Sequence, residues 1–269
     1  MHTAFTTAAG ELHCARLPEA PWAWGHGGRT LGTAVLDGPN KAWLRVMETL
    51  AHKRGGKLWT GTAQAADAIP TGIPRPRLLR SHEWTRGDHA YRAELTTYVA
   101  TPVCSTTPAL TAPLELPDSW FGRLREAVET LSATPAPPGR GPVITQDYVH
   151  RALPRYVGAA ETETTVHRWS LAHGDLHWAN ITAPELNILD WEGFGPAPHG
   201  FDAAHLHAYT LPTPDIAARV RDTFADTLHT DEGRQAELIV AAIILQAADR
   251  DPVHAHLAPL LKEHIANLR

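Results

Sequence analysis

The sequence has few cysteines, no surplus of basic residues and no long apolar run. Its 269 residues include 2 Cys, too few for a disulfide framework. The longest apolar run lies near residues 238–248, well short of the roughly 18 residues that a membrane-spanning helix needs. The first residues show no charged stretch followed by an apolar one, so we expect no signal peptide. These absences predict a soluble, cytoplasmic protein with no membrane partner.

Charge and composition narrow the class of protein further. The 24 Lys and Arg residues are outnumbered by 29 Asp and Glu residues, which gives a formal net charge of −5. A general nucleic-acid-binding protein carries a basic surplus, so we expect no nucleic-acid partner. A hydrophobic share of 43% is enough for a sizeable core. The length is long for one ordinary domain and short for two independent ones, which favours one domain with two lobes.

The first hundred residues have the pattern of an antiparallel sheet with one helix. The residues 37–40, Asp-Gly-Pro-Asn, separate two apolar runs and are a strong hairpin signal. Residues 58–69 have helical composition and stop before Pro70. Strands are expected over residues 22–28, 30–36, 41–47, 77–84 and 91–99.

The remainder of the chain is expected to be mostly helical. Residues 102–117 are rich in Pro, Thr and Ser and predict a boundary between lobes 1–100 and 101–269. Residues 179–191 are expected to form two short strands flanking Pro184-Glu185. A sheet-rich front followed by a helical back predicts an α+β fold. The expected helices cover residues 120–132, 146–157, 161–171, 201–209, 214–229, 232–249 and 253–268.

The residues with the clearest chemical pattern lie between positions 173 and 192. Asp175 can accept a proton, Asn180 offers an amide oxygen five positions later, and Asp190 ends an apolar stretch. Phosphoryl transfer needs a positioned hydroxyl, a proton acceptor and phosphates neutralised by Mg²⁺. Mg²⁺ prefers hard oxygen ligands such as carboxylates. The pattern H-x-D-x-x-x-x-N, followed by an apolar strand ending in Asp, therefore indicates a kinase catalytic loop.

Over residues 172–206 the chain resembles the aminoglycoside phosphotransferase family, a branch of the protein-kinase-like fold. That family has H-G-D in its catalytic loop, and Gly174 stands at the middle position here. The family's metal-binding segment, I-D-W or I-D-F followed by an acid, is similar to Leu189-Asp190-Trp191-Glu192. A D-x-A motif after a glycine is matched by residues 200–204. The resemblance implies a two-lobe fold with a small antiparallel β lobe carrying one helix and a larger helical C-terminal lobe.

The same resemblance implies roles for five residues of the C-terminal lobe. Asp175 is expected to act as the catalytic base, with Asn180 and Asp190 as ligands of Mg²⁺. His173 and Asp202 are expected to support the catalytic loop. Asp202 can equally cap the helix that follows it.

The front lobe is expected to bind ATP, with GTP also possible. Gly25, Gly27 and Gly28 lie between two strands, where backbone N–H groups can approach phosphates. An ordinary hairpin turn explains these glycines nearly as well. Lys41 and Arg45 share one face of the next strand, and the family's pattern favours Arg45 as the phosphate-binding cation.

The acidic partner of that cation is missing from the expected place. Kinases supply a Glu from the front-lobe helix, but the helix expected over residues 58–69 has only Gln64 and Asp67 as candidates. This leaves open a non-catalytic, nucleotide-binding pseudokinase, although such a protein would have no chemical need for an intact catalytic loop. The adenine-binding connector is expected at the end of the last front-lobe strand, with Glu94, Thr96 and Tyr98 as candidates.

The acceptor is expected to be a hydroxyl of a small molecule. The resemblance implies an antibiotic or antibiotic-like acceptor, as in resistance or self-resistance, with a metabolic sugar, nucleoside or amino alcohol as the alternative. No A-P-E signature follows Asp190, which disfavours a protein substrate. Possible acceptor contacts are His177, Trp178, Trp191 and Glu192, although core packing also explains the two tryptophans.

A metallohydrolase is the alternative from another class. His173, Asp175 and His177 form H-x-D-x-H, and imidazole and carboxylate ligands suit Zn²⁺. This reading explains neither Asn180 nor Asp190. His205 and His207 lie two apart in an expected helix and would face different ways.

Overall fold

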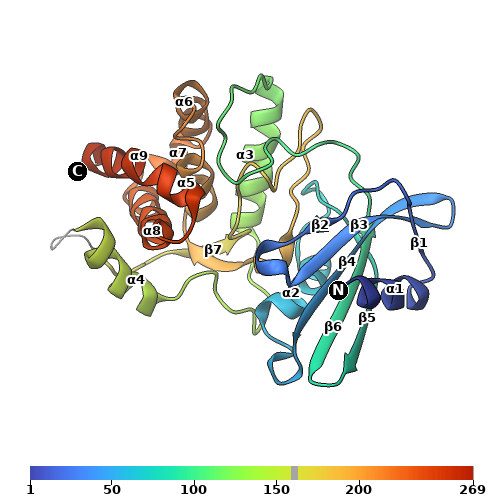
Figure 1. The fold of residues 1–269 in the computed structure, drawn as a ribbon. Helices are drawn as coiled ribbons and strands as arrows, with labels where there is room; N and C mark the ends of the chain where they lie inside the picture. The colour runs from blue at the N-terminus through green and yellow to red at the C-terminus, as the bar shows by residue number, and fades with distance from the viewer. Residues whose placement is uncertain (159–162, 269) are drawn as a thin grey trace. The chain divides into compact units, whose positions relative to one another are not determined.

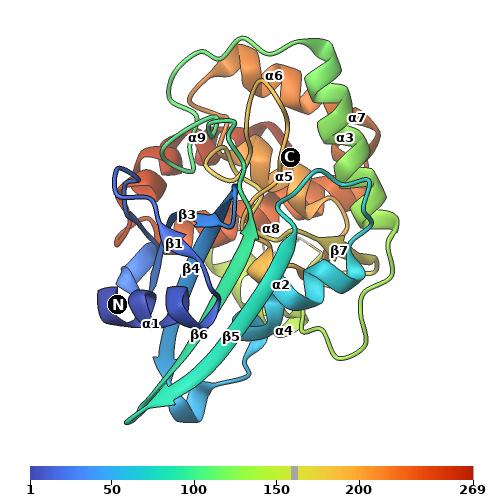
Figure 2. The same ribbon diagram turned by 90° about the vertical axis from the view of Figure 1, so that its right-hand side faces the viewer.

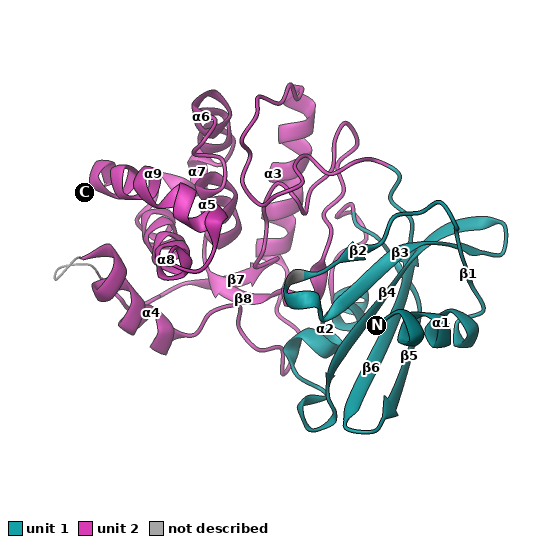
Figure 3. Cartoon of the chain, in the orientation of Figure 1, with its two compact units in different colours: residues 1–67, 75–100 teal, residues 68–74, 101–269 magenta. Residues whose placement is uncertain are grey.

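The structure is a computed structural model that describes residues 1–158 and 163–268. The chain divides into two compact units, residues 1–67 with 75–100 and residues 68–74 with 101–269 (Figure 3). Their elements are labelled in Figure 1. Within the described residues, no helix has both the length and the hydropathy that crossing a bilayer requires. The expected α+β fold class is confirmed.

The first unit is built on an antiparallel sheet of six strands (Figure 1, Figure 2). Its order is β1-β3-β4-β6-β5, and β2 pairs with a separate part of β3. The expected hairpin is confirmed, because Asp37 pairs with Asn40 at the turn between β3 and β4. The strands are β1 (Ala15–Arg16), β2 (Ala23–Trp24), β3 (Thr30–Asp37), β4 (Asn40–Leu50), β5 (Leu78–Arg86) and β6 (His89–Thr97).

Two α-helices accompany this sheet. The expected helix is confirmed as α2 (Lys57–Ala68). The other, α1 (His2–Glu11), was not expected, because its Thr- and Ala-rich sequence has no repeating stripe of large apolar residues. Its burial comes from tertiary packing: Phe5 lies edge-on to Trp22 with ring centroids 4.9 Å apart, within the core formed by β3, β4 and β6.

The second unit is mostly helical, with a two-stranded antiparallel sheet formed by β7 (Trp169–Ala172) and β8 (Gly195–Pro198). Helix α5 is buried along its whole length and packs on α8, which in turn packs on α9. The helices are α3 (Asp118–Ala133), α4 (Gln146–Ala152), α5 (Phe201–Ala208), α6 (Pro214–Thr223), α7 (Ala225–Leu228), α8 (Asp231–Ala247) and α9 (Pro252–Leu268), with a π-helical turn at Leu153–Val157.

Two expected elements of this unit are wrong. The start of the helix expected over residues 161–171, including Glu161, lies outside the described residues. Residues 163–168 are irregular and residues 169–172 form β7, because pairing with β8 satisfies their backbone groups.

The two strands expected over residues 179–191 shrink to a single bridge between Ile181 and Ile188. Thr182 closes the turn instead: its hydroxyl donates to the carbonyl of Glu185 at 2.6 Å and accepts from the N–H of Asn187 at 2.9 Å. Backbone bonds from Thr182 to Asn187 and from Leu189 to Asn180 accompany this bridge, and the Thr182 side chain closes the turn between the two segments.

Candidate active site

The backbone of the H-G-D segment is held by a carboxylate from α5. One oxygen of Asp202 accepts the backbone N–H of His173 at 2.7 Å, and the other accepts that of Gly174 at 2.9 Å. The Asp202 side chain is buried, which raises the pKa of its carboxyl group, and the two N–H donors oppose that rise. Helix α5 therefore fixes the chain immediately before Asp175.

Gly174 has two structural reasons to be glycine. Its φ of +84° lies in the left-handed region that side chains disfavour. A Cβ atom at this position would lie 2.6 Å from a methyl group of Val143. The tight turn between His173 and Asp175 therefore excludes the larger residue found in H-R-D sequences.

His173 joins the catalytic loop to the segment that carries Asp190. Its Nε2 lies 2.7 Å from the carbonyl oxygen of Leu189, and its ring packs edge-on to Trp191 at 4.8 Å. The N–H of Leu189 in turn donates to the carbonyl of Asn180 at 2.8 Å. The bond between Leu189 and Asn180 therefore places Asn180 beside the residue that precedes Asp190.

Asp175 presents an ionised carboxylate to solvent. Its side chain is 52% exposed, and Nε2 of His177 lies 3.5 Å from Oδ2. Burial of part of the group would raise the pKa of the Asp175 carboxyl, but the hydrogen bond and charge of His177 outweigh it and hold this pKa below its usual range. Asp175 is therefore available to accept a proton at neutral pH.

Asn180 and Asp190 offer oxygen ligands of the kind that Mg²⁺ takes. The amide nitrogen of Asn180 donates to the carbonyl oxygen of Asp175 at 3.0 Å, which orients the amide. Asp190 is exposed and adopts a left-handed conformation with φ 59° and ψ 59°. Such a conformation is uncommon outside glycine and clusters at functional sites.

The two tryptophans proposed as acceptor contacts are core residues instead. Trp178 is fully buried, stacks on Trp120 with centroids 6.2 Å apart, and donates its indole N–H to Thr210 at 2.7 Å. Trp191 is also buried and donates to the carbonyl of Ile188 at 2.8 Å. Neither ring face is open to a ligand. His177 is buried to 8% exposure but contacts Asp175.

Arg140 is a supporting residue that sequence reasoning missed. Its buried guanidinium donates to the carbonyls of Glu192 at 2.6 Å and Phe194 at 2.7 Å. It also lies over the Phe194 ring, 4.2 Å from the centroid. Arg140 thus fixes the turn after Asp190, including Glu192. It comes from a Pro- and Gly-rich loop whose sequence carries no signal of this role.

His205, considered from the sequence only as a possible metal ligand, lies against the segment that follows H-G-D. Its ring stacks near that of His177 at 6.3 Å, and its Nδ1 lies 3.1 Å from the carbonyl of Leu176. Burial lowers the pKa of His205 to about 4, although the charge of Asp175 opposes this. His205 is therefore neutral at neutral pH.

The H-x-D-x-H reading finds no support in this geometry. Within the part of the chain that the structure describes, the only metal-type group with ligand atoms all within 4.8 Å of one another is His207, Glu237 and His264. The set of His173, Asp175 and His177 does not form such a group. Hydrogen bonds to backbone carbonyls account for His173 and His205 instead.

In the first unit, Arg45 is paired with an acid from the neighbouring strand. Its Nη2 lies 3.2 Å from Oε2 of Glu94, its cross-strand partner on β6. Arg92 contacts the other oxygen of this 2%-exposed carboxylate at 2.8 Å. Glu94 and Thr96 therefore lie inside β6, which corrects their placement in an adenine-binding connector. Of the three candidates, only Tyr98 follows the strand.

The pair with Glu94 also answers the question of the missing helix Glu. Helix α2 carries Gln64 and Asp67, as the sequence showed, and no Glu. The sheet supplies the carboxylate instead. Lys41, the other candidate cation, sits at the exposed start of β4 with its ammonium over the ring of Tyr98, 5.8 Å from the centroid.

The glycines at residues 25–28 form a closed turn between β2 and β3. Gly28 donates to the carbonyl of Gly25 at 3.0 Å, and Gly25 donates to that of Thr30 at 3.1 Å. Gly27 and Gly28 have φ values of +70° and +69°. Turn geometry therefore accounts for Gly27 and Gly28, and the close approach of the Thr30 side chain accounts for Gly25.

No protein-family model matches the chain, and no curated protein matches its sequence. Solved structures do match. One is a thermostable mutant of aminoglycoside phosphotransferase APH(4)-Ia in ternary complex with ADP and hygromycin B, with 11% identity, TM-score 0.62, and coverage of 93% of this chain and 94% of that one. Amicoumacin kinase hAmiN, in complex with AMP-PNP, Ca²⁺ and Ami, has 12% identity and TM-score 0.56, over 94% and 90% of the two chains. A microcompartment-associated aminopropanol kinase has 12% identity and TM-score 0.54, over 94% and 92%. The chain therefore has the fold of aminoglycoside phosphotransferases and related small-molecule kinases.

Proposed function

We propose that the protein is a Mg²⁺-dependent kinase that transfers the γ-phosphate of ATP to a hydroxyl of a small, antibiotic-like molecule. The observation that carries the proposal is the arrangement of Asp175, Asn180 and Asp190. Asp202 and Leu189 bond the backbone of the H-G-D-x-x-x-x-N pattern, and Arg140 bonds the backbone of the turn that follows Asp190. Hydrogen bonds that position the backbone in this way suit phosphoryl transfer, in which proteins act mainly by orienting the reactants and neutralising charge.

Each residue of this arrangement has a role that fits its environment. The exposed, ionised carboxylate of Asp175 accepts the hydroxyl proton of the acceptor. Asn180 and Asp190 hold Mg²⁺ through oxygen atoms, and bound Mg²⁺ neutralises phosphate charge. In the first unit, Arg45 binds a phosphate oxygen, and Glu94 orients its guanidinium.

The acceptor class rests on the solved structures of the same fold. The complexes with hygromycin B and with Ami support an antibiotic acceptor. The match to an aminopropanol kinase supports a small amino alcohol as the second candidate. A single panel of acceptors tests both.

The test is an ATP-consumption screen with Mg²⁺ across aminoglycosides, peptide and nucleoside antibiotics, sugars and amino alcohols, repeated with GTP. The active pair is then measured with Asp175→Asn, which keeps the size of the side chain and loses its charge. We expect transfer to fall by roughly 10²–10⁴ while nucleotide affinity stays nearly unchanged. Asp249→Asn, an exposed acid in the same unit, is the matched control and should transfer normally. Undiminished transfer by Asp175→Asn would overturn the proposed mechanism.

A further inference from the structure

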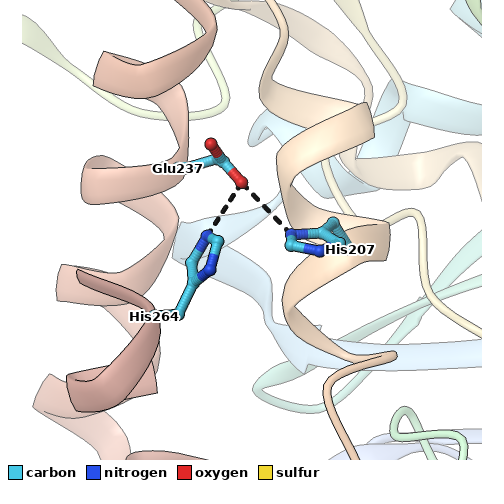
Figure 4. Close-up of side chains that lie close together, drawn as sticks. All are labelled: His207, Glu237 and His264. Atoms are coloured by element: carbon cyan, nitrogen blue, oxygen red, sulfur yellow. Dashed lines mark hydrogen bonds and ion pairs between the residues drawn. The ribbon is translucent and has the colours of Figure 1, made fainter. Parts of the chain in front are cut away.

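Three helices of the second unit bring together two histidines and a glutamate away from the catalytic loop. His207 lies on α5, Glu237 on α8 and His264 on α9 (Figure 4). Nδ1 of His207 is 3.2 Å from Oε1 of Glu237, and Nε2 of His264 is 2.9 Å from the same oxygen. The two imidazole rings lie 4.9 Å apart. Both rings present a nitrogen to one carboxylate.

The carboxylate at the centre of this cluster is buried and half unsatisfied. The Glu237 side chain is 2% exposed. Its Oε1 accepts contacts from His207, His264 and Arg221, whereas its buried Oε2 has no hydrogen-bond partner among the described residues. A buried carboxylate oxygen without a partner is costly, and an unseen ion is one of its standard explanations.

The donor set and its spacing suit a zinc ion. Two imidazole nitrogens and a carboxylate are established ligands for Zn²⁺, at about 2.0–2.1 Å from the metal, so that ligand atoms in a tetrahedral site lie about 3.3 Å apart. The nitrogen-to-oxygen distances here are 3.2 and 2.9 Å. Mg²⁺ takes oxygen ligands and does not suit two imidazoles.

We propose that His207, Glu237 and His264 form a Zn²⁺ site that fastens α5 to α8 and α9. Helix α5 also carries Asp202, so the site would brace the helix that holds the catalytic loop. This site is separate from the Mg²⁺ ligands of the proposed kinase and does not depend on that function.

Arg221 competes with a metal ion for the carboxylate of Glu237. Its Nη1 lies 2.7 Å from Oε1 of Glu237, and its side chain is 28% exposed. Arg221 therefore contacts the same oxygen that both histidines contact, and its guanidinium has to share that oxygen with a bound metal or move away from it. Removing this positive charge should strengthen zinc binding.

The experiment measures zinc directly on the full chain. Protein stripped with a chelator is titrated with Zn²⁺ in buffer containing excess Mg²⁺, and bound zinc is counted by elemental analysis after dialysis. We expect one Zn²⁺ per chain and a rise in Tm of about 5 °C when zinc is present at about 100 times its Kd. Less than a tenth of an equivalent retained, with no rise in Tm, would overturn the proposal.

Three variants locate the ion. His264→Ala, at a half-buried position near the end of α9, should fold and lose zinc binding at least about 100-fold. Arg221→Gln should bind zinc at least as tightly as the parent protein. His256→Ala, an exposed histidine on the same helix, is the matched control and should bind normally.

Two results would contradict this placement. Zinc retained at full affinity by His264→Ala would belong to another group, such as the histidines of the catalytic loop. The second contradicting result is a parent protein that binds no zinc, with the Tm of His264→Ala below that of the parent by the same amount whether or not zinc is present. The three residues would then form a hydrogen-bonded cluster only. If Glu237→Gln folds, it should also lose zinc binding. If it does not fold, the zinc binding of His264→Ala alone tests the placement.

Discussion

Arg45 and Glu94 are cross-strand partners on β4 and β6, with Nη2 of the guanidinium 3.2 Å from Oε2 of the carboxylate. In protein kinases the phosphate-binding cation is paired with a Glu from a helix, and the position of that helix controls the pair. Here both partners belong to adjacent strands of one sheet, and Arg92 holds the second oxygen of Glu94 at 2.8 Å. The position of Arg45 is therefore set by the sheet.

Arg45→Ala should weaken ATP binding about 10- to 100-fold, because it removes a charge-assisted hydrogen bond to phosphate. Lys41→Ala, on the same strand but at its exposed start, is the control and should change ATP affinity little. Both affinities can be measured by calorimetry with Mg·ATP. The reverse ranking of the two variants would show that the phosphate-binding cation has been assigned wrongly.

Asp190→Asn should abolish the part of nucleotide affinity that depends on Mg²⁺. Asparagine tolerates the left-handed conformation that Asp190 adopts, so this change removes the charge without straining the backbone. Titrations of ATP with Mg²⁺ and with excess chelator should differ for the parent protein and coincide for the variant. Unchanged Mg·ATP affinity would exclude Asp190 as a metal ligand.

Gly174→Ala should lower both stability and transfer. The new methyl group would meet Val143 at 2.6 Å, and the φ of +84° is unfavourable for any side chain. A loss of about 1–3 kcal/mol in the free energy of unfolding is expected. Adding Val143→Ala removes the clash but not the unfavourable φ, so denaturant titration should show partial recovery. Full recovery, or no loss at all, would contradict this account of the turn.

The burial of His205 predicts a loss of stability in mild acid. Its pKa is about 4 in the folded chain and about 6.5 when unfolded, so the unfolded state binds more protons as the pH falls from 6.5 to 4. This group alone should cost about 2 kcal/mol of folding free energy at pH 5 relative to neutral pH.

His205→Asn places its amide nitrogen near the position of Nδ1, so it keeps a donor for the carbonyl of Leu176, and it cannot titrate. The fall in Tm between pH 7.5 and pH 5 should therefore be several degrees smaller in this variant than in the parent protein. Identical pH profiles would mean that His205 is accessible to protons in the folded state.

The sequence alone predicted those features that depend on local pattern. The hairpin at residues 37–40 followed from turn chemistry, and helices α3, α8 and α9 were expected over residues 120–132, 232–249 and 253–268. The proposed catalytic residues were identifiable because their chemistry dictates residue type and spacing within one short segment. The α+β class was predictable for the same reason, since it is a sum of local elements.

Other features were decided by contacts between residues far apart in the chain. Helix α1 is stabilised because Phe5 packs into the core of the first unit. Residues 169–172 form a strand because they pair with β8. Glu94 became the partner of Arg45, and not part of a connector, only when β4 and β6 paired in their observed register.

The contacts that hold the proposed catalytic residues in place also join residues that are far apart in the chain. Asp202, Arg140 and the bond between Leu189 and Asn180 act across 9 to 54 positions of the sequence. The residue types of the H-G-D loop are identifiable from one short stretch of sequence, because the chemistry of phosphoryl transfer requires them. Their positions are fixed by long-range hydrogen bonds and burial. The D-x-A motif indicated one of these partners, Asp202, whereas no local pattern specifies Arg140 or the bond between Leu189 and Asn180.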